Sequence, residues 1–185
     1  SEIIARLGGT ENAFTGRDFT AYFQTIAADE LDTMMRWESD RMANLALDAE
    51  EFAREKEVVK EEWRTRVRDN PNGRLNQLLY ATAFTSSGYH HPVIGWKTDI
   101  DAYTLDDLQR WYEAHYAPNN ATLVVVGDVD PAEVVAMARE HYGRVPRRDL
   151  PPAKPREEQA QHGIKRARLS IPAKLPHLSM GYKAP

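Results

Sequence analysis

The chain has 185 residues, 42% of them hydrophobic and 28% charged, which is typical of a folded globular protein and excludes an intrinsically disordered one. Its net charge of −4, from 24 Lys and Arg against 28 Asp and Glu, argues against nucleic acid as the main partner. The chain has no cysteine, which excludes disulfides and thiolate nucleophiles, and no apolar run approaches the roughly 20 residues that span a bilayer.

The first residues have the pattern of a helix end followed by a hairpin. Residues 1–9 place Ile3, Ile4 and Leu7 on one face and finish on a glycine pair at the C-cap. A helix that begins without an N-cap, and a final alternating run over residues 178–182, make both ends look cut, so we expect a fragment. Residues 12–26 alternate in polarity around a turn at 16–18, which predicts a β-hairpin or one long bent strand.

Helical periodicity follows the hairpin. We expect one helix from about Asp29, with Asp29 as its cap, and a second from Asp48, where Glu51 completes a capping-box pattern. The second helix should continue through Val67 and stop at Asn70-Pro71-Asn72-Gly73. Leucines over residues 75–82 predict a third helix.

The rest of the chain mixes loops, helices and expected strands. Residues 85–103 read as a long loop, and further helices are expected from Thr104 to His115 and from Asp130 to about Gly143. The apolar, β-branched run 121–127 predicts a buried central strand. A proline-rich, charged crossing segment at 145–161 precedes two more expected strands, 166–171 and 178–182. The predicted fold class is therefore α+β, with a mixed or antiparallel sheet and helices on one face, in a single domain over 1–185.

Two glutamates of the expected second helix share one face. Glu55 and Glu62 are seven positions apart, and at about 100° per residue they differ by roughly 20° in direction, whereas Glu57 and Glu61 point the other way. A carboxylate beside buried surface needs an ion pair, hydrogen bonds or a metal ion, because an unpaired buried charge is costly. The alternative is an ordinary solvated helix face with ion pairs between successive turns, and the spacing alone leaves both open.

The histidines do not form a metal site by spacing. None has a second His, Asp or Glu placed to complete a site on one element, and catalytic zinc usually takes three protein ligands. His90 and His91, in the long loop, either face a cleft or pack within the loop. Motifs typical of serine hydrolases, phosphate-binding loops and dinucleotide-binding folds are absent.

Several short segments stand in order along nearly the whole chain. They are the pair Gly8-Gly9, the run Asn12-Ala13-Phe14-Thr15 with the aromatic stretch up to Tyr22, the acidic stretch 55–62, His91-Pro92 with Gly95, and residues 117–128, which contain Pro118-Asn119-Asn120 and end on Gly127-Asp128. This ordered set resembles the pitrilysin/insulinase family of zinc metallopeptidases, which includes the mitochondrial processing peptidases. The resemblance implies a processing-peptidase-like fold.

The resemblance also implies a zinc site built from a His-x-x-Glu-His motif on one helix and a glutamate on a later helix. By position, Glu62 matches that later zinc ligand, and Glu55 matches the acid that supports the site. The family adds its peptide substrate as a further strand to an exposed edge strand. In this sequence that edge strand corresponds to Asn12, Ala13, Phe14 and Thr15.

The His-x-x-Glu-His motif itself is absent from the sequence. In the family it precedes the helix that leads to the glycine pair, so it is expected upstream of Ser1. We therefore expect a fragment of a zinc endopeptidase for unstructured peptides that is inactive by itself and binds zinc weakly or not at all. One alternative is a non-catalytic half or subunit of a peptidase clamshell, and another is an α+β domain that shares only the fold.

The partners implied by the resemblance are a peptide substrate and a second homologous domain or subunit that completes the clamshell. Nucleic acid, and a membrane contact through this segment, are not expected. The lack of cysteine is compatible with either the periplasm or the cytoplasm of a bacterium.

Overall fold

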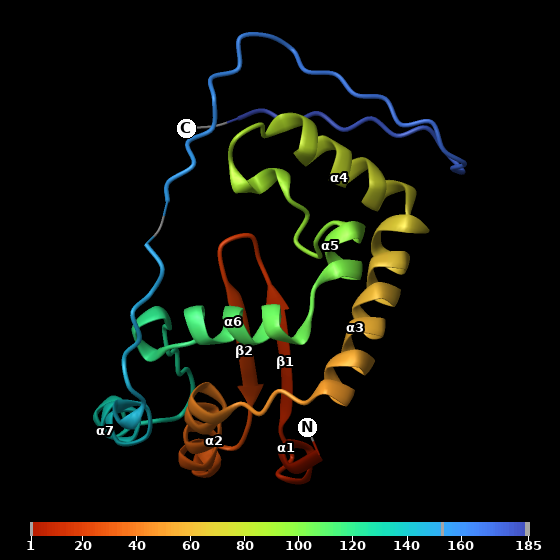
Figure 1. Cartoon of the computed structure of the whole chain (residues 1–185). Helices are drawn as coiled ribbons and strands as arrows, with labels where there is room; N and C mark the ends of the chain where they lie inside the picture. Colours follow the sequence, from red (N-terminus) through yellow and green to blue (C-terminus); the bar gives the residue numbers. More distant parts are fainter. Residues whose placement is uncertain (1, 153, 184–185) are drawn as a thin grey trace. The chain divides into compact units, whose positions relative to one another are not determined.

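The structure is a computed structural model that describes residues 2–152 and 154–183 (Figure 1). The chain divides into two compact units, one built from residues 2–47 and 104–152 and the other from 48–103 and 154–183. The first unit contains α1 (Glu2–Arg6), β1 (Thr10–Thr15), β2 (Thr20–Thr25), α2 (Leu31–Asn44), α6 (Leu105–His115) and α7 (Pro131–His141). The second contains α3 (Ala49–Trp63), a π-helical turn η2 (Arg64–Arg68), α4 (Pro71–Ala83), the 3-10 turn η3 (Gly88–His90) and α5 (Lys97–Ala102).

A two-stranded antiparallel hairpin follows α1 in the first unit (Figure 1). Gly8 adopts the left-handed conformation, with φ of 72°, and the N–H of Gly9 bonds back to the carbonyl of Ile4 at 2.9 Å. This glycine-dependent C-cap turns the chain directly into β1. In the register, Ala13 lies opposite Tyr22 and Thr15 opposite Thr20. The hairpin predicted from alternation is confirmed.

The helices of the first unit bury a small apolar core. Among its described residues, the buried apolar side chains are Ile4, Met34, Met35, Tyr112 and Ala117. Helices α2 and α7 contact each other, and His141 Nε2 lies 2.7 Å from Asp32 Oδ1 across their interface. Helix α6 begins where the sequence predicts a helix, after Thr104, and it has a complete capping box between Thr104 and Asp107.

Two side-chain caps determine where the long helices of the second unit begin. The carboxylate of Asp48 accepts the N–H groups of Glu51 and Glu50 at 2.9 Å each, and these bonds hold the pKa of Asp48 below its usual value. Glu51 pairs with Arg54 rather than returning to the Asp48 backbone, so the cap is confirmed without the full box. Asn70 ends the preceding turn and caps α4, whose first residue is Pro71.

The prediction of three strands outside the hairpin, over 121–127, 166–171 and 178–182, is wrong for the described residues. Residues 121–127 form no strand, and Val124 and Val126 are 75% and 91% exposed. Residues 166–171 and 178–182 likewise form no strand and are largely exposed. β-Branched composition gives a strand only where neighbouring strands complete its hydrogen bonds, and the described residues pair β1 with β2 alone.

Two local expectations also need correction. Asp29 lies inside the 3-10 turn η1 (Ala28–Glu30) and does not cap α2, whose N-cap residue is Glu30 and makes no side-chain cap bond. The expected loop 85–103 contains both η3 and the short helix α5. The proline-rich crossing segment over 145–161 is irregular, as predicted, apart from residue 153, which lies outside the described residues.

The fold is α+β, as predicted, with many helices and a small antiparallel sheet. In the part of the chain that the structure describes, no helix combines the length and apolar character needed to cross a membrane.

Candidate functional site

Glu62 lies in the last turn of α3. Its side chain is 38% exposed, and Oε1 is 2.9 Å from Nη2 of Arg66, one turn further along the chain. The Arg66 side chain is itself 70% exposed. An exposed pair of this kind contributes only about 0 to 1 kcal/mol, because both charges remain solvated. The carboxylate is therefore partnered but can be released to another cation at little cost.

The backbone beside Glu62 is irregular. The α-helix passes at Trp63 into the π-helical turn η2. This geometry is rare in proteins, and where it occurs it is often at a functional site. A Cβ placed on Gly73 would lie 1.9 Å from the carbonyl oxygen of Arg66, so only glycine lets α4 approach this turn. The indole Nε1 of Trp63 is buried without a hydrogen-bond partner among the described residues. Sequence periodicity carries no signal for the π-helical turn or for the unpaired indole.

Glu55 lies two turns before Glu62 on the continuous helix α3, so the two carboxylates share one helix face. Glu55 is exposed, and no hydrogen bond or ion pair of its side chain is present among the described residues. Glu57 and Glu61 instead pair with Lys60 and Arg64. The alternative of an ordinary solvated helix face, with ion pairs between successive turns, therefore holds for Glu57 and Glu61.

Lysine contacts fix α3 against the end of α5. The ammonium of Lys56 donates to the carbonyls of Asp101 at 2.8 Å and Tyr103 at 2.7 Å. The ring of Phe52 packs edge-on against Tyr103, with centroids 5.3 Å apart. A lysine on the last carbonyls of a helix also complements its dipole. These contacts position helix α3 against α5 and its C-terminal residue Tyr103.

The donor set for a metal is incomplete in the described residues. They contain no group of three or more His, Cys, Asp or Glu side chains that could hold a metal ion. A carboxylate such as that of Glu62 is a suitable zinc donor, and among the described residues its ion-pair partner is the exposed guanidinium of Arg66. The described residues therefore do not form a complete metal site by themselves.

The loop histidines pack against their own loop. The indole N–H of Trp96 donates to Nδ1 of His91 at 2.8 Å, and Nδ1 of His90 lies 2.6 Å from the carbonyl of Ser87. The two imidazole rings lie 4.0 Å apart. Of the two alternatives left open by the sequence, packing within the loop describes these side chains.

Residues 12–15 form the outer part of the hairpin. All four are exposed, and β1 pairs through one edge only, with β2. Its other edge has no strand partner among the residues that the structure describes. An unpaired edge presents backbone N–H and C=O groups that can pair with another extended chain. These residues belong to the first unit and the two glutamates to the second.

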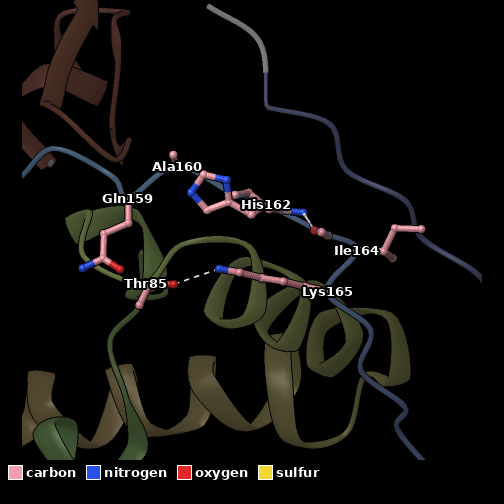
Figure 2. Close-up of a pocket in the computed structure, with 8 residues that line it drawn as sticks. Thr85, Gln159, Ala160, His162, Ile164 and Lys165 are labelled. Carbon is pink, nitrogen blue, oxygen red and sulfur yellow. Dashed lines mark hydrogen bonds between the residues drawn. The ribbon is translucent and has the colours of Figure 1, made fainter.

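A shallow pocket of about 260 Å³ lies in the second unit, and none of the predicted site residues lines it. It is lined by Thr85 and residues 159–165, and Figure 2 shows Lys165 reaching Thr85, where Nζ donates to Oγ1 at 2.8 Å. No acidic side chain is among the residues that line it. We assign it no part in the candidate site.

Comparison with known proteins decides the family. The model of the insulinase family (peptidase family M16) matches residues 1–96, and the model of the peptidase M16 inactive domain matches residues 102–185. The chain belongs to peptidase family M16. The two matched stretches do not coincide with the two structural units, because each unit takes residues from both.

Named relatives in family M16 are zinc proteases. The chain is 33% identical to the zinc protease PqqE of Helicobacter pylori over 190 aligned positions, which cover 100% of this chain and 42% of that protein. It is 30% identical to an uncharacterized zinc protease of Mycobacterium leprae, covering 77% of this chain and 32% of that protein. The chain therefore spans less than half the length of these relatives.

Solved M16 structures share the fold. The crystal structure of a protease from Helicobacter pylori superposes with a TM-score of 0.84 at 33% identity, over 89% of this chain and 40% of that one. The first half of the periplasmic protease PqqL from Escherichia coli superposes with a TM-score of 0.72 at 24% identity, over 82% of this chain and 33% of that one. The fold expected from the resemblance is confirmed.

Proposed function

We propose that this chain is part of a zinc-dependent endopeptidase and that Glu62 supplies one of the zinc ligands. The observation that carries the proposal is the Glu62 carboxylate itself, 38% exposed at the π-helical end of α3 and paired, among the described residues, with the exposed guanidinium of Arg66. The named relatives are zinc proteases. Two imidazoles, from a His-x-x-Glu-His motif outside this sequence, would complete a three-ligand site.

A zinc ion held there would supply Lewis-acid chemistry, polarising the scissile carbonyl and lowering the pKa of a bound water. The role of this chain is to present the Glu62 carboxylate in a fixed position, because α3 is anchored through Lys56 and through the close approach at Gly73. Glu55, exposed on the same helix face, would support the site through neighbouring groups without touching the reacting atoms.

We also propose that β1 binds the substrate backbone. Asn12, Ala13, Phe14 and Thr15 are exposed on an edge that has no strand partner among the described residues. An extended peptide added there would be recognised through main-chain hydrogen bonds, which favours unstructured substrates over particular sequences. Residues 1–185 would then form one N-terminal-type peptidase domain, and a second homologous domain would close over the peptide as a clamshell.

The experiment is peptide hydrolysis by the longer protein that contains this chain and the upstream motif, with and without a chelator. Glu62→Gln should lose zinc and activity together, by more than the about 10- to 100-fold expected for a supporting residue. Glu61→Gln, one position away on a solvated face, is the matched control and should keep both. Full activity in Glu62→Gln would overturn the ligand assignment.

Glu55→Gln should lower turnover by about 10- to 100-fold while folding stability stays normal. Thermal unfolding of the same preparation checks the stability, and a turnover equal to that of the wild type would remove Glu55 from the site.

A second candidate function is that of a non-catalytic partner in a peptidase clamshell. The match of residues 102–185 to the M16 inactive domain favours it. The two candidates differ in the residues preceding Ser1 in the gene: an intact motif there supports the enzyme, and its absence supports the partner.

A further inference from the structure

The β1–β2 hairpin is not held in place by a hydrophobic core. Every residue of β1 is exposed, and the large side chains Phe14, Phe19 and Phe23 are about half-exposed. These rings contact one another, with Phe14 5.7 Å from Phe19 and 6.2 Å from Phe23. An isolated two-stranded hairpin is at best marginally stable in water. Something other than apolar burial must fix its position.

The opposite face of β2 carries a polar bracket, defined here as Tyr22, Gln24, Glu38, Arg41 and Tyr116. The hydroxyls of Tyr22 and Tyr116 lie 2.6 Å apart. The amide of Gln24 donates to Glu38 Oε1 at 2.9 Å, and Nε of Arg41 donates to the same oxygen at 3.3 Å. The Arg41 guanidinium also lies over the Tyr22 ring, 4.1 Å from its centroid. The bracket thus ties β2 to α2 and to the end of α6.

Tyr116 is itself rigidly placed. Its N–H donates to the carbonyl of Tyr112 at 2.9 Å, and the two rings stack with centroids 5.1 Å apart. Tyr112 is buried, and its hydroxyl donates to the carbonyls of Arg41 and Met42 at 2.8 and 2.7 Å. Burial, together with the hydrogen bond to Tyr22, raises the pKa of Tyr116 well above its usual value. The anchor point on α6 is therefore part of the folded core.

The bracket reaches β1 through the strand ladder. Ala13 lies directly opposite Tyr22 in the register, and Glu11 lies opposite Gln24. We propose that Tyr22 and Tyr116 are positioning residues that fix strand β1, and with it the edge that receives the peptide. The peptide-binding part of this inference rests on the proposed function, whereas the positioning of β1 does not.

The test compares Tyr22→Phe, Tyr116→Phe and the double variant in the chain itself. Each single change keeps the ring and removes one hydroxyl. We expect amide exchange in β1 and β2 to accelerate about fivefold, as for the loss of one hydrogen bond, with no further increase in the double variant. Exchange in α7 should not change. Tyr182→Phe, which removes the hydroxyl of a tyrosine that is 88% exposed in the other unit, is the matched control.

Two further readouts separate positioning from general stability. Tyr22→Phe should move the ultraviolet titration of Tyr116 toward the usual tyrosine pKa. In the longer peptidase, it should raise KM for peptides several-fold at unchanged kcat and zinc content. Unchanged exchange in β1 would overturn the positioning role, and so would equal acceleration in β1 and α7, which would mean general destabilisation. Neither outcome depends on zinc, so failure here is distinct from failure of Glu62 as a ligand.

Discussion

Helix α3 and strand β1, which carry the proposed metal-binding and peptide-binding residues, are held in place in different ways. Helix α3 is positioned by backbone contacts: Gly73 lets α4 approach the Arg66 carbonyl, and Lys56 binds carbonyls at the end of α5. Strand β1 has exposed side chains, a ladder to one neighbour and a side-chain bracket behind that neighbour. The difference matches the two tasks, because a metal ligand needs a fixed geometry and a peptide-binding edge must accept varied chains.

The most disruptive change to α3 should be Gly73→Ala. The added Cβ would overlap a backbone oxygen at 1.9 Å, so α4 or η2 must move. We expect the free energy of unfolding to fall by about 3 kcal/mol, at the upper end of typical overpacking costs. Chemical denaturation measures it, with Gly88→Ala, whose Cβ meets nothing within 4 Å, as the control. Equal stabilities for the two variants would show that the close approach does not position α3.

The corresponding change at the hairpin is Gly9→Ala, which should cost less. Its Cβ would lie 2.8 Å from the carbonyl oxygen of Thr25 and 3.1 Å from the side chain of Ile4, which can move. We expect a loss of about 1 to 2 kcal/mol. Gly143→Ala, with open space around the added methyl group, is the control. A loss larger than that of Gly73→Ala would reverse the comparison between the two regions.

The segment 154–183 extends the comparison, because it has no ladder at all. The Glu158 carboxylate accepts the N–H groups of Thr85, Ser86 and Ser87 at 2.9 to 3.0 Å and binds Lys183 Nζ at 2.9 Å. Glu158→Gln should release this segment while global stability barely changes. Limited trypsin digestion measures the release, with Glu157→Gln as the neighbouring control; equal digestion of both variants would contradict it.

The contact made by the Glu158 carboxylate should depend on pH. Backbone hydrogen bonds, first from Ser87, and Lys183 hold the pKa of Glu158 well below its usual value. Its contribution is therefore complete above the unfolded-state pKa of about 4.3 and is lost only as the pH falls further. The chemical shift of the Ser87 amide, followed by NMR, should report a midpoint clearly below that of a free glutamate. A midpoint at or above that of a free glutamate would contradict this contact.

The smallest effect should come from Arg54→Gln. Its partner Glu51 is on the solvated surface of α3, and both side chains are more than half exposed. Such pairs contribute little, so the free energy of unfolding should change by less than about 0.5 kcal/mol. A clearly larger loss, measured by chemical denaturation, would show that surface charges help to hold α3.

Local signals predicted the helices better than the strands. The caps at Asp48, Thr104 and Asp130 identified α3, α6 and α7 because a cap acts within a few residues. The prediction of a buried strand over 121–127 was wrong, because a strand depends on partners elsewhere in the chain. Helix α5 was missed because it is six residues long and starts without a side-chain cap.

The candidate site also has features that the sequence predicted and features that it did not. Periodicity alone put Glu55 and Glu62 on one face, and the i, i+4 spacing of Glu62 and Arg66 allows their ion pair. The π-helical turn, by contrast, lies where Gly73 of α4 approaches the Arg66 carbonyl, which periodicity does not show. The roles of these glutamates and of residues 12–15 stay predictions. These roles were inferred from the ordered set of segments that resembles the pitrilysin/insulinase family, since no single motif in the sequence specifies zinc.

The most direct test of the central claim is an anomalous difference map at the zinc absorption edge, from crystals of the longer protein. We predict a peak about 2.0 to 2.2 Å from a carboxylate oxygen of Glu62, with Arg66 turned away from that oxygen. A zinc peak bound by other residues, with Glu62 still paired to Arg66, would contradict the account.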